Sequence, residues 1–165
     1  MGKVKQMKEI LMSIRAKHNH NIEAGLKTAE LRLKPPKCEL PFKVLTYESG
    51  ADGRHKVVNE WICDKITEWR ICMGIPAHLP KAACVSAEEI REYSGRDCKD
   101  ISEMHITNLK IYDKPKELSE FCIPCKVSCE NCKNPLYFEC WCEEKGKKVV
   151  TRPPRSWCYV ETERD

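Results

Sequence analysis

Polar and apolar residues alternate in several short runs of this sequence, a pattern that limits the folds available to the chain. Residues 28–34 (TAELRLK) place aliphatic side chains on one side of an extended chain and polar, mostly basic side chains on the other. Residues 42–49 (FKVLTYES) and 56–63 (KVVNEWIC) are further runs of this kind, separated by the turn-like sequence GADG. Since a period of two is typical of half-buried strands, the sequence predicts a strand at 28–34 and a β-hairpin after it.

Two short helices are predicted between the strands. Residues 16–25 (AKHNHNIEAG) are typical of a helix that ends at Gly25 in a left-handed conformation. Ser86, followed three residues later by Glu89, forms a capping box that begins a second helix. The segment 71–85 between them contains prolines and is predicted to be irregular. The remaining predicted strands cover residues 9–15, 104–113 and 156–160.

These elements predict an α+β fold. We expect a mixed, mostly antiparallel sheet that closes into a small β-barrel, with the helices at its ends. The 165 residues suffice for one domain and leave little room for two. Residues 1–165 are therefore predicted to form a single domain, with an insertion at 122–142.

The distribution of charge and hydrophobicity argues against a membrane protein. No apolar run approaches the roughly 20 residues that cross a bilayer, and a net charge of +4 is too small for a polybasic anchor. The first residues, MGKVKQMKEILMSIR, carry charges on both sides of a very short apolar patch, unlike a signal peptide. We expect a cytoplasmic protein without a membrane partner, in a reducing compartment; no sequence feature identifies a protein partner.

The cysteines are strongly clustered. Half of the 12 cysteines fall between Cys122 and Cys142, where the spacing C-x2-C-x3-C-x2-C is followed by a C-x-C pair. Thiolates this close can point at one zinc ion from a tight turn. We therefore expect a structural zinc, with Cys122 and Cys142 as reserve ligands; a thiol-rich loop or a redox disulfide is the alternative. The four preferred ligands are Cys125, Cys129, Cys132 and Cys140.

Candidate binding residues lie on and beside the polar face of residues 28–34. Lys27, at the entrance of this strand, can bind a phosphate or act as nucleophile or base, although a solvated loop lysine is the plainer alternative. Glu30 and Arg32 share one strand face, where they either hold a substrate amide or form a surface ion pair worth less than about 1 kcal/mol. Ser13 and Arg15 end the first strand and are candidates for the same cleft.

The histidines are weaker candidates for ligand or metal binding. His105 shares a strand face with apolar residues, which favours a histidine packed in the core over one that contacts a ligand. His18 and His20 are two residues apart on the predicted helix, so both cannot face one metal ion.

Basic residues concentrate in two segments. Residues 27–43 hold five basic and two acidic residues, and residues 143–155 hold the same numbers, so each segment has a net charge of +3. A basic rim around a cleft suits phosphate contacts. The alternative is a solvated face that only contributes to solubility.

The order of the motifs resembles the ASCH superfamily, which is related to the PUA domains. The resemblance is carried by LMSIRAKH, by GLKTAELR with Gly25, Lys27, Thr28 and Arg32, and by MHITNLKIYDKPKELSEF and RPPRSWCYV, the last two resembling a bacterial and phage-associated subgroup with a cysteine-bearing insertion. It implies a PUA-like β-barrel with a cleft for RNA or nucleotide-like ligands. Some relatives are amidohydrolases acting on acetylated cytidine, and others are ribonucleases. Glu30 stands where the amidohydrolase relatives have a threonine of the proposed catalytic set.

Three functional hypotheses follow. The first is an RNA- or nucleotide-binding protein with a basic cleft and a structural zinc. The second is a hydrolase of the ASCH type, in which Lys27 and Glu30 are the catalytic residues. The third is a metal-stabilised adaptor for protein interactions without a nucleotide ligand. The predicted ligand-binding residues are Ser13, Arg15, Lys27, Thr28, Glu30, Arg32 and His105.

Overall fold

The structure, a computed structural model, describes residues 7–124 and 147–162. Within these ranges the chain is α+β, as predicted, with three α-helices and one eight-stranded sheet. The elements in chain order are β1 (Glu9–Arg15), α1 (Ala16–Glu23), β2 (Ala29–Arg32), β3 (Phe42–Ser49), β4 (Val57–Trp69), the 3₁₀ helix η1 (Ile71–Met73), α2 (Leu79–Ala83), α3 (Ala87–Ser94), β5 (Ile101–Lys116), the 3₁₀ helix η2 (Leu118–Glu120), β6 (Phe121–Pro124), β7 (Lys147–Val149) and β8 (Trp157–Thr162).

The strands lie in the order β2-β5-β4-β3-β1-β8-β6-β7. β1 and β3 pair in parallel, and the other paired strands of the described residues run antiparallel. The predicted hairpin is therefore confirmed as β3 and β4. The parallel pair arises because α1 and β2 carry the chain back between β1 and β3, as a crossover connection requires.

The prediction of a closed barrel is wrong for the described residues, because the sheet has two ends, β2 and β7. β1 pairs with β3 along Glu9–Arg15 and with β8 along Glu9–Met12, and β2 pairs with β5 but has no backbone ladder to β1 among the described residues. Side chains bridge this seam instead. Arg32 of β2 donates from Nη2 to the carbonyl oxygen of Ser13 (2.9 Å) and from Nη1 to Oγ of Ser156 (3.1 Å).

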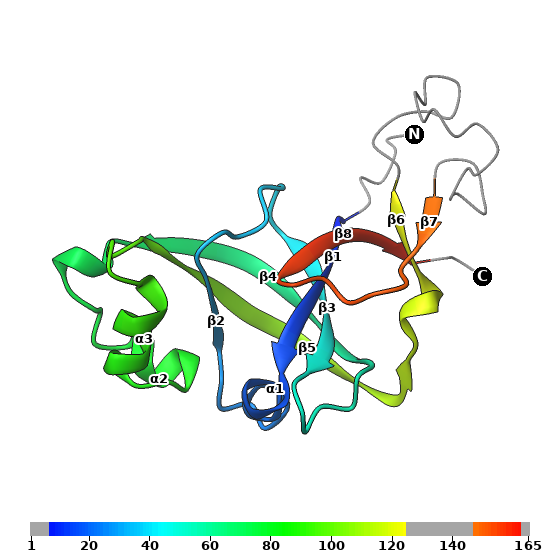
Figure 1. The fold of residues 1–165 in the computed structure, drawn as a ribbon, viewed down its shortest axis with the longest axis horizontal. Coiled ribbons are helices and arrows are strands. Elements are labelled where there is room, and N and C mark those ends of the chain that lie inside the picture. Colours follow the sequence, from blue (N-terminus) through cyan, green and yellow to red (C-terminus); the bar gives the residue numbers. More distant parts are fainter. Residues whose placement is uncertain (1–6, 125–146, 163–165) are drawn as a thin grey trace, which may run out of the picture.

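The long strands β4 and β5 extend to one end of the molecule, where α2 and α3 lie, and β6 and β7 lie toward the other end (Figure 1). Ser86 and Glu89 form the predicted capping box at the start of α3, with hydrogen bonds of 2.7 and 3.1 Å. Gly25 ends the α1 turn at φ +72°, as predicted. The segment predicted to be irregular instead contains η1 and α2, each only one turn or so long.

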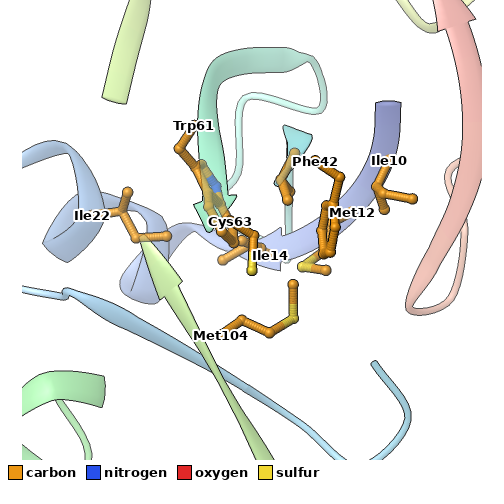
Figure 2. Close-up of a cluster of buried hydrophobic side chains, with 9 residues drawn as sticks. Ile10, Met12, Ile14, Ile22, Phe42, Trp61, Cys63 and Met104 are labelled. Atoms are coloured by element: carbon orange, nitrogen blue, oxygen red, sulfur yellow. The ribbon is translucent and has the colours of Figure 1, made fainter. Parts of the chain in front are cut away.

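The central core forms between β1, α1 and the middle of the sheet. Figure 2 shows Trp61, Phe42 and Met104 packed with residues of β1 and with Ile22 of α1. Trp61 is fully buried, and its indole N–H donates to Oγ1 of Thr46 (3.1 Å), which satisfies the one polar atom of the side chain. This core anchors α1 on the sheet and so fixes one wall of the pocket described below.

No helix among the described residues is long and apolar enough to cross a membrane.

Candidate functional site

A pocket of about 460 Å³ opens at the seam between β1 and β2. Its walls come from β1, α1, β2, α3 and the segment that precedes β8. The lining residues are Ser13, Ile14, Arg15, His18, Lys27, Glu30, Leu31, Arg32, Ser49, Ala83, Val85, Glu89, Ile90, Tyr93 and Arg155. Five of the seven predicted ligand-binding residues, namely Ser13, Arg15, Lys27, Glu30 and Arg32, thus lie at one cavity.

Three charged side chains form a continuous buried row in this pocket. Glu30 lies between Lys27 and Arg32: its Oε2 is 3.2 Å from Nζ of Lys27, and its Oε1 is 3.0 Å from Nη2 of Arg32. Lys27 also donates to the carbonyl oxygen of Ala83 at the end of α2 (2.9 Å). Only 4% of Lys27 and 7% of Glu30 is exposed, so these ion pairs are buried and do not lie on the surface.

Burial alone would raise the pKa of Glu30. The positive charges of Lys27 and Arg32 outweigh this effect and hold the pKa of Glu30 below its ordinary value. The carboxylate is therefore ionised at neutral pH. With two cations for one anion, the row carries a net positive charge, which favours an anionic or strongly polar ligand.

The segment before β8 closes the pocket on the side of β1. Ser13 donates from Oγ to the carbonyl oxygen of Pro154 (2.6 Å), and its backbone N–H donates to the carbonyl oxygen of Ser156 (3.0 Å). Because Arg32 also bonds Ser156, three separate parts of the chain meet here. This arrangement brings Arg155, from the second basic segment of the sequence, to the pocket that holds Lys27 from the first.

The charged residues of the lining are mostly basic. Arg15, Lys27, Arg32 and Arg155 face the cavity against two carboxylates, Glu30 and Glu89. Tyr93 of α3, 44% exposed, adds an aromatic ring.

A polar network behind α1 fixes one wall of the pocket. Asn19 is fully buried; its Nδ2 donates to Oε2 of Glu48 (2.7 Å), and its Oδ1 accepts from Nδ2 of Asn59 (2.8 Å). Arg54, in the turn between β3 and β4, donates to both carboxylate oxygens of Glu48 and to Glu23 of α1. The network ties α1 to β3 and β4 and leaves His18, the neighbour of Asn19, in the pocket lining.

Two predicted binding residues lie outside the pocket lining. Thr28 is exposed, and its backbone bonds Ala82 and Ile106, which fixes the entry to β2. His105 is an exposed residue whose Nδ1 lies 2.8 Å from Oδ1 of Asp64, so the interpretation as a core histidine is wrong, while its role in ligand binding stays a prediction. The physical reason is the register shift between Cys63 and Ile66 on β4, which leaves Asp64 bulged out beside His105.

The preferred zinc ligands and Cys142 lie outside the described residues, so the zinc site stays a prediction. Cys122 is described: it is buried in β6, opposite Val149 of β7. In residues 7–124 and 147–162, no group of three or more potential ligands could hold a metal ion.

Among the lining residues with polar side chains, sequence reasoning missed five: His18, Ser49, Glu89, Tyr93 and Arg155. The sequence presents His18 as half of an unsuitable metal-ligand pair and Glu89 as part of a capping box. The basic segment 143–155 was the available signal for Arg155. No local pattern pointed to Tyr93, because its position depends on how α3 packs beside β2.

No protein-family model and no curated protein matches this chain by sequence. The fold, however, matches the crystal structure of ASCH from Zymomonas mobilis with a TM-score of 0.65, at 16% sequence identity, covering 93% of this chain and 88% of that one. The chain has the ASCH fold. Crystal structures of two single-residue mutants of the Zymomonas mobilis protein match in the same way, with TM-scores of 0.65 and 0.64 at 14% and 16% identity; they cover 93% of this chain and 89% and 91% of theirs. The resemblance stated from the motifs is thus confirmed at the level of the ASCH fold.

Proposed function

We propose that this ASCH-fold protein binds RNA or a nucleotide-like ligand in the pocket between β1, α1 and β2. The main support for this proposal is the buried row of Lys27, Glu30 and Arg32, which lies at a cavity lined by four basic and two acidic residues. Such a site attracts phosphate electrostatically, and the guanidinium groups can bind it with charge-assisted hydrogen bonds.

The size and lining of the pocket support a ligand about as large as one nucleotide. Its volume of about 460 Å³ falls within the range of roughly 300–1,000 Å³ that is typical of small-molecule sites. Tyr93 offers a ring on which a base can stack. The paired and stacked bases of a duplex cannot enter a pocket of this size, so the proposed RNA ligand is a strand end or an unpaired nucleotide.

The test is a thermal-shift screen of nucleosides, nucleotides and short RNAs, since a ligand that binds only the native state raises the melting temperature. Binders are then measured against Arg155→Ala, with Arg152→Ala as the matched control outside the lining. We expect Arg155→Ala to weaken binding and to reduce its salt dependence, and Arg152→Ala to do so less. Failure of every nucleoside, nucleotide and RNA to bind the wild-type protein would refute the proposal.

A hydrolase is the second candidate, because Nζ of Lys27 lies 3.2 Å from a carboxylate oxygen of Glu30 in a buried site. Such a pair could assist attack on an acyl group. The assay is hydrolysis of acylated nucleosides. In a hydrolase, Lys27→Ala abolishes turnover and leaves binding measurable, whereas in a binding protein it weakens affinity together with the salt dependence.

A structural zinc held by Cys125, Cys129, Cys132 and Cys140 remains part of the proposal. Its support is the cysteine spacing in the sequence. A zinc at this place would stabilise the insertion between β6 and β7, and we assign it no part in the chemistry of the pocket.

A further inference from the structure

Two side chains of α3 border the pocket on one face of the helix. Glu89 and Tyr93 are four residues apart, which makes them neighbours on the helix surface, and both line the cavity. Both are open to a ligand, because the side chain of Glu89 is 49% exposed and Tyr93 is 44% exposed. This face of α3 therefore offers a carboxylate and an aromatic ring side by side.

The fold holds this face of α3 in place. Ile90, the residue after Glu89, is buried in a core cluster and fixes the helix against its neighbours. Oε2 of Glu89 accepts the backbone N–H of Ser86 (2.7 Å), which positions the carboxylate. That hydrogen bond and the positive charge of Lys17 outweigh the effect of burial and hold the pKa of Glu89 below its ordinary value. The carboxylate is therefore ionised at neutral pH.

The carboxylate of Glu89 keeps room for two further donors. Its Oε1 lies 3.9 Å from Nζ of Lys17, which is longer than a direct hydrogen bond, and the side chain of Lys17 is 73% exposed. An ion pair of this kind contributes little in water, so the N–H of a ligand can replace it. Oε2 has a second lone pair besides the one that faces Ser86. One ligand can thus donate two hydrogen bonds to this carboxylate.

The two ends of the pocket differ in charge. Lys27 bonds a carbonyl oxygen at the end of α2, whereas Arg32 bonds Ser156 just before β8. In Figure 1, β2 lies between these two sides. The end near α3 combines Lys27 with the carboxylate of Glu89, and the end near β8 combines the cations Arg32 and Arg155. A phosphate is attracted to the β8 end and repelled by the carboxylate, so the base of a bound nucleotide points toward α3.

Among the four common RNA bases, guanine matches this face of α3. It presents two neighbouring N–H donors, at N1 and at the N2 amino group. Adenine and cytosine each present one amino group beside a ring nitrogen that accepts, and uracil presents one N–H between two carbonyl oxygens. An ionised carboxylate can only accept, so it pairs with both donors of guanine and meets a repelling acceptor on each of the other three bases.

We propose that the pocket binds guanine, with the carboxylate of Glu89 accepting from N1–H and the N2 amino group and the ring of Tyr93 stacking on the base. This inference rests on the proposed function and specifies the base that the pocket selects.

The test compares wild-type binding of guanosine and inosine monophosphate by calorimetry. Inosine differs from guanosine only by lacking the N2 amino group, so the two ligands share their phosphate contacts. We expect guanosine monophosphate to bind about tenfold more tightly, as the loss of one hydrogen bond implies. Adenosine, cytidine and uridine monophosphates should bind more weakly than guanosine monophosphate.

The variant Glu89→Gln tests the role of the carboxylate. Gln also serves in a capping box, so the start of α3 is kept, but its amide offers only one accepting oxygen. We expect at least tenfold weaker binding of guanosine monophosphate and no preference over inosine monophosphate. Adenosine monophosphate should bind no worse, since a negative charge has been removed. Glu88→Gln makes the same change on the same helix outside the lining and is the matched control.

The variants of Tyr93 test the stacking contact. Tyr93→Phe keeps the ring and should retain the affinity for guanosine monophosphate, whereas Tyr93→Ala should weaken binding of every nucleotide by a similar factor. A short RNA with an unpaired terminal guanosine distinguishes the two sources of the base. Tighter binding of this RNA than of guanosine monophosphate would identify an RNA end as the ligand, and equal affinities would identify the free nucleotide.

The guanine site and the proposed function fail in different ways. If the wild-type protein binds nucleotides without preferring guanosine over inosine monophosphate, or if Glu89→Gln keeps the preference, the guanine site is wrong and the proposed function stands. If no nucleoside, nucleotide or RNA binds the wild-type protein, the proposed function fails and the guanine site fails with it. The comparison of the two ligands on the wild-type protein decides even if Glu89→Gln does not fold.

Discussion

Replacing Glu48 by Gln should destabilise the protein in a way that depends on pH. Glu48 is fully buried on β3 and accepts from Asn19 (2.7 Å) and from three donors of Arg54 (2.6, 2.9 and 3.0 Å). Burial disfavours the charged carboxylate, but the hydrogen bonds and the charge of Arg54 outweigh it and lower the pKa of Glu48 from 4.5 to about 2. The substitution keeps the shape of the side chain and removes its charge.

The pKa shift of Glu48 gives the size of the expected loss of folding free energy. The difference between 4.5 and about 2 corresponds to about 3 kcal/mol of folding free energy, because each pKa unit is worth about 1.4 kcal/mol. The pKa is lower in the folded state, so this stability is present above pH 4.5 and is lost as the pH falls toward 2. We therefore expect Glu48→Gln to cost about 3 kcal/mol at pH 7 and progressively less below pH 4.5.

Urea denaturation of the wild-type and variant proteins at pH 7 and at several acidic pH values measures both effects. Glu88→Gln is the control: it lies on α3 with a side chain 77% exposed, and its replacement should change stability by less than about 1 kcal/mol at each pH. A Glu48→Gln penalty below about 1 kcal/mol at pH 7, or one that stays the same at pH 3, would refute the reasoning.

Three further predictions concern the pocket and the cysteines. Arg32→Ala should abolish nucleotide binding and destabilise the fold by about 3 kcal/mol in urea denaturation, because Glu30 keeps only one of its two cationic partners in a buried site; unchanged binding and stability would contradict the role of the row. Elemental analysis of protein purified without added metal should find about one zinc per chain, reduced in Cys129→Ser or Cys132→Ser; metal-free protein with an ordered cysteine segment would exclude the site. A strong chelator should increase protease cleavage within residues 122–142 while the main cooperative transition survives, since the central core is formed by buried residues between Ile10 and Met104; complete unfolding would show that the metal holds the whole fold.

Local patterns predicted the elements that depend on neighbouring residues. The alternation at residues 28–34 correctly placed Glu30 and Arg32 on one side of β2, because side-chain direction in a strand follows from the backbone alone. The capping box at Ser86 was correct for a similar reason, since its two hydrogen bonds span only three residues.

Features that depend on long-range contacts were not predictable in this way. In the sequence, Glu48 looks like an ordinary polar residue at the end of a strand. Its complete burial depends on Asn19 of α1 and on Arg54 of the β3–β4 turn, which both donate hydrogen bonds to it. His105 was assigned to an apolar face, but Met104 beside it faces the core. Further along β5, Asn108 has a left-handed backbone (φ +49°), consistent with the changed alternation after it.

The wrong prediction of a closed barrel and the position of the pocket have one cause. β1 pairs with β3 along its whole length and with β8 only along Glu9–Met12, and beyond Met12 the described link between β1 and β2 is a side-chain contact at Ser13. Arg32 provides that link, and the space beside it remains as the cavity. A continuous backbone ladder at this seam would leave no room for a ligand between β1 and β2. The polar face of β2 is therefore buried at the place where the sheet stays open. This explains why charged residues with the sequence pattern of an exposed strand are almost fully buried in the fold.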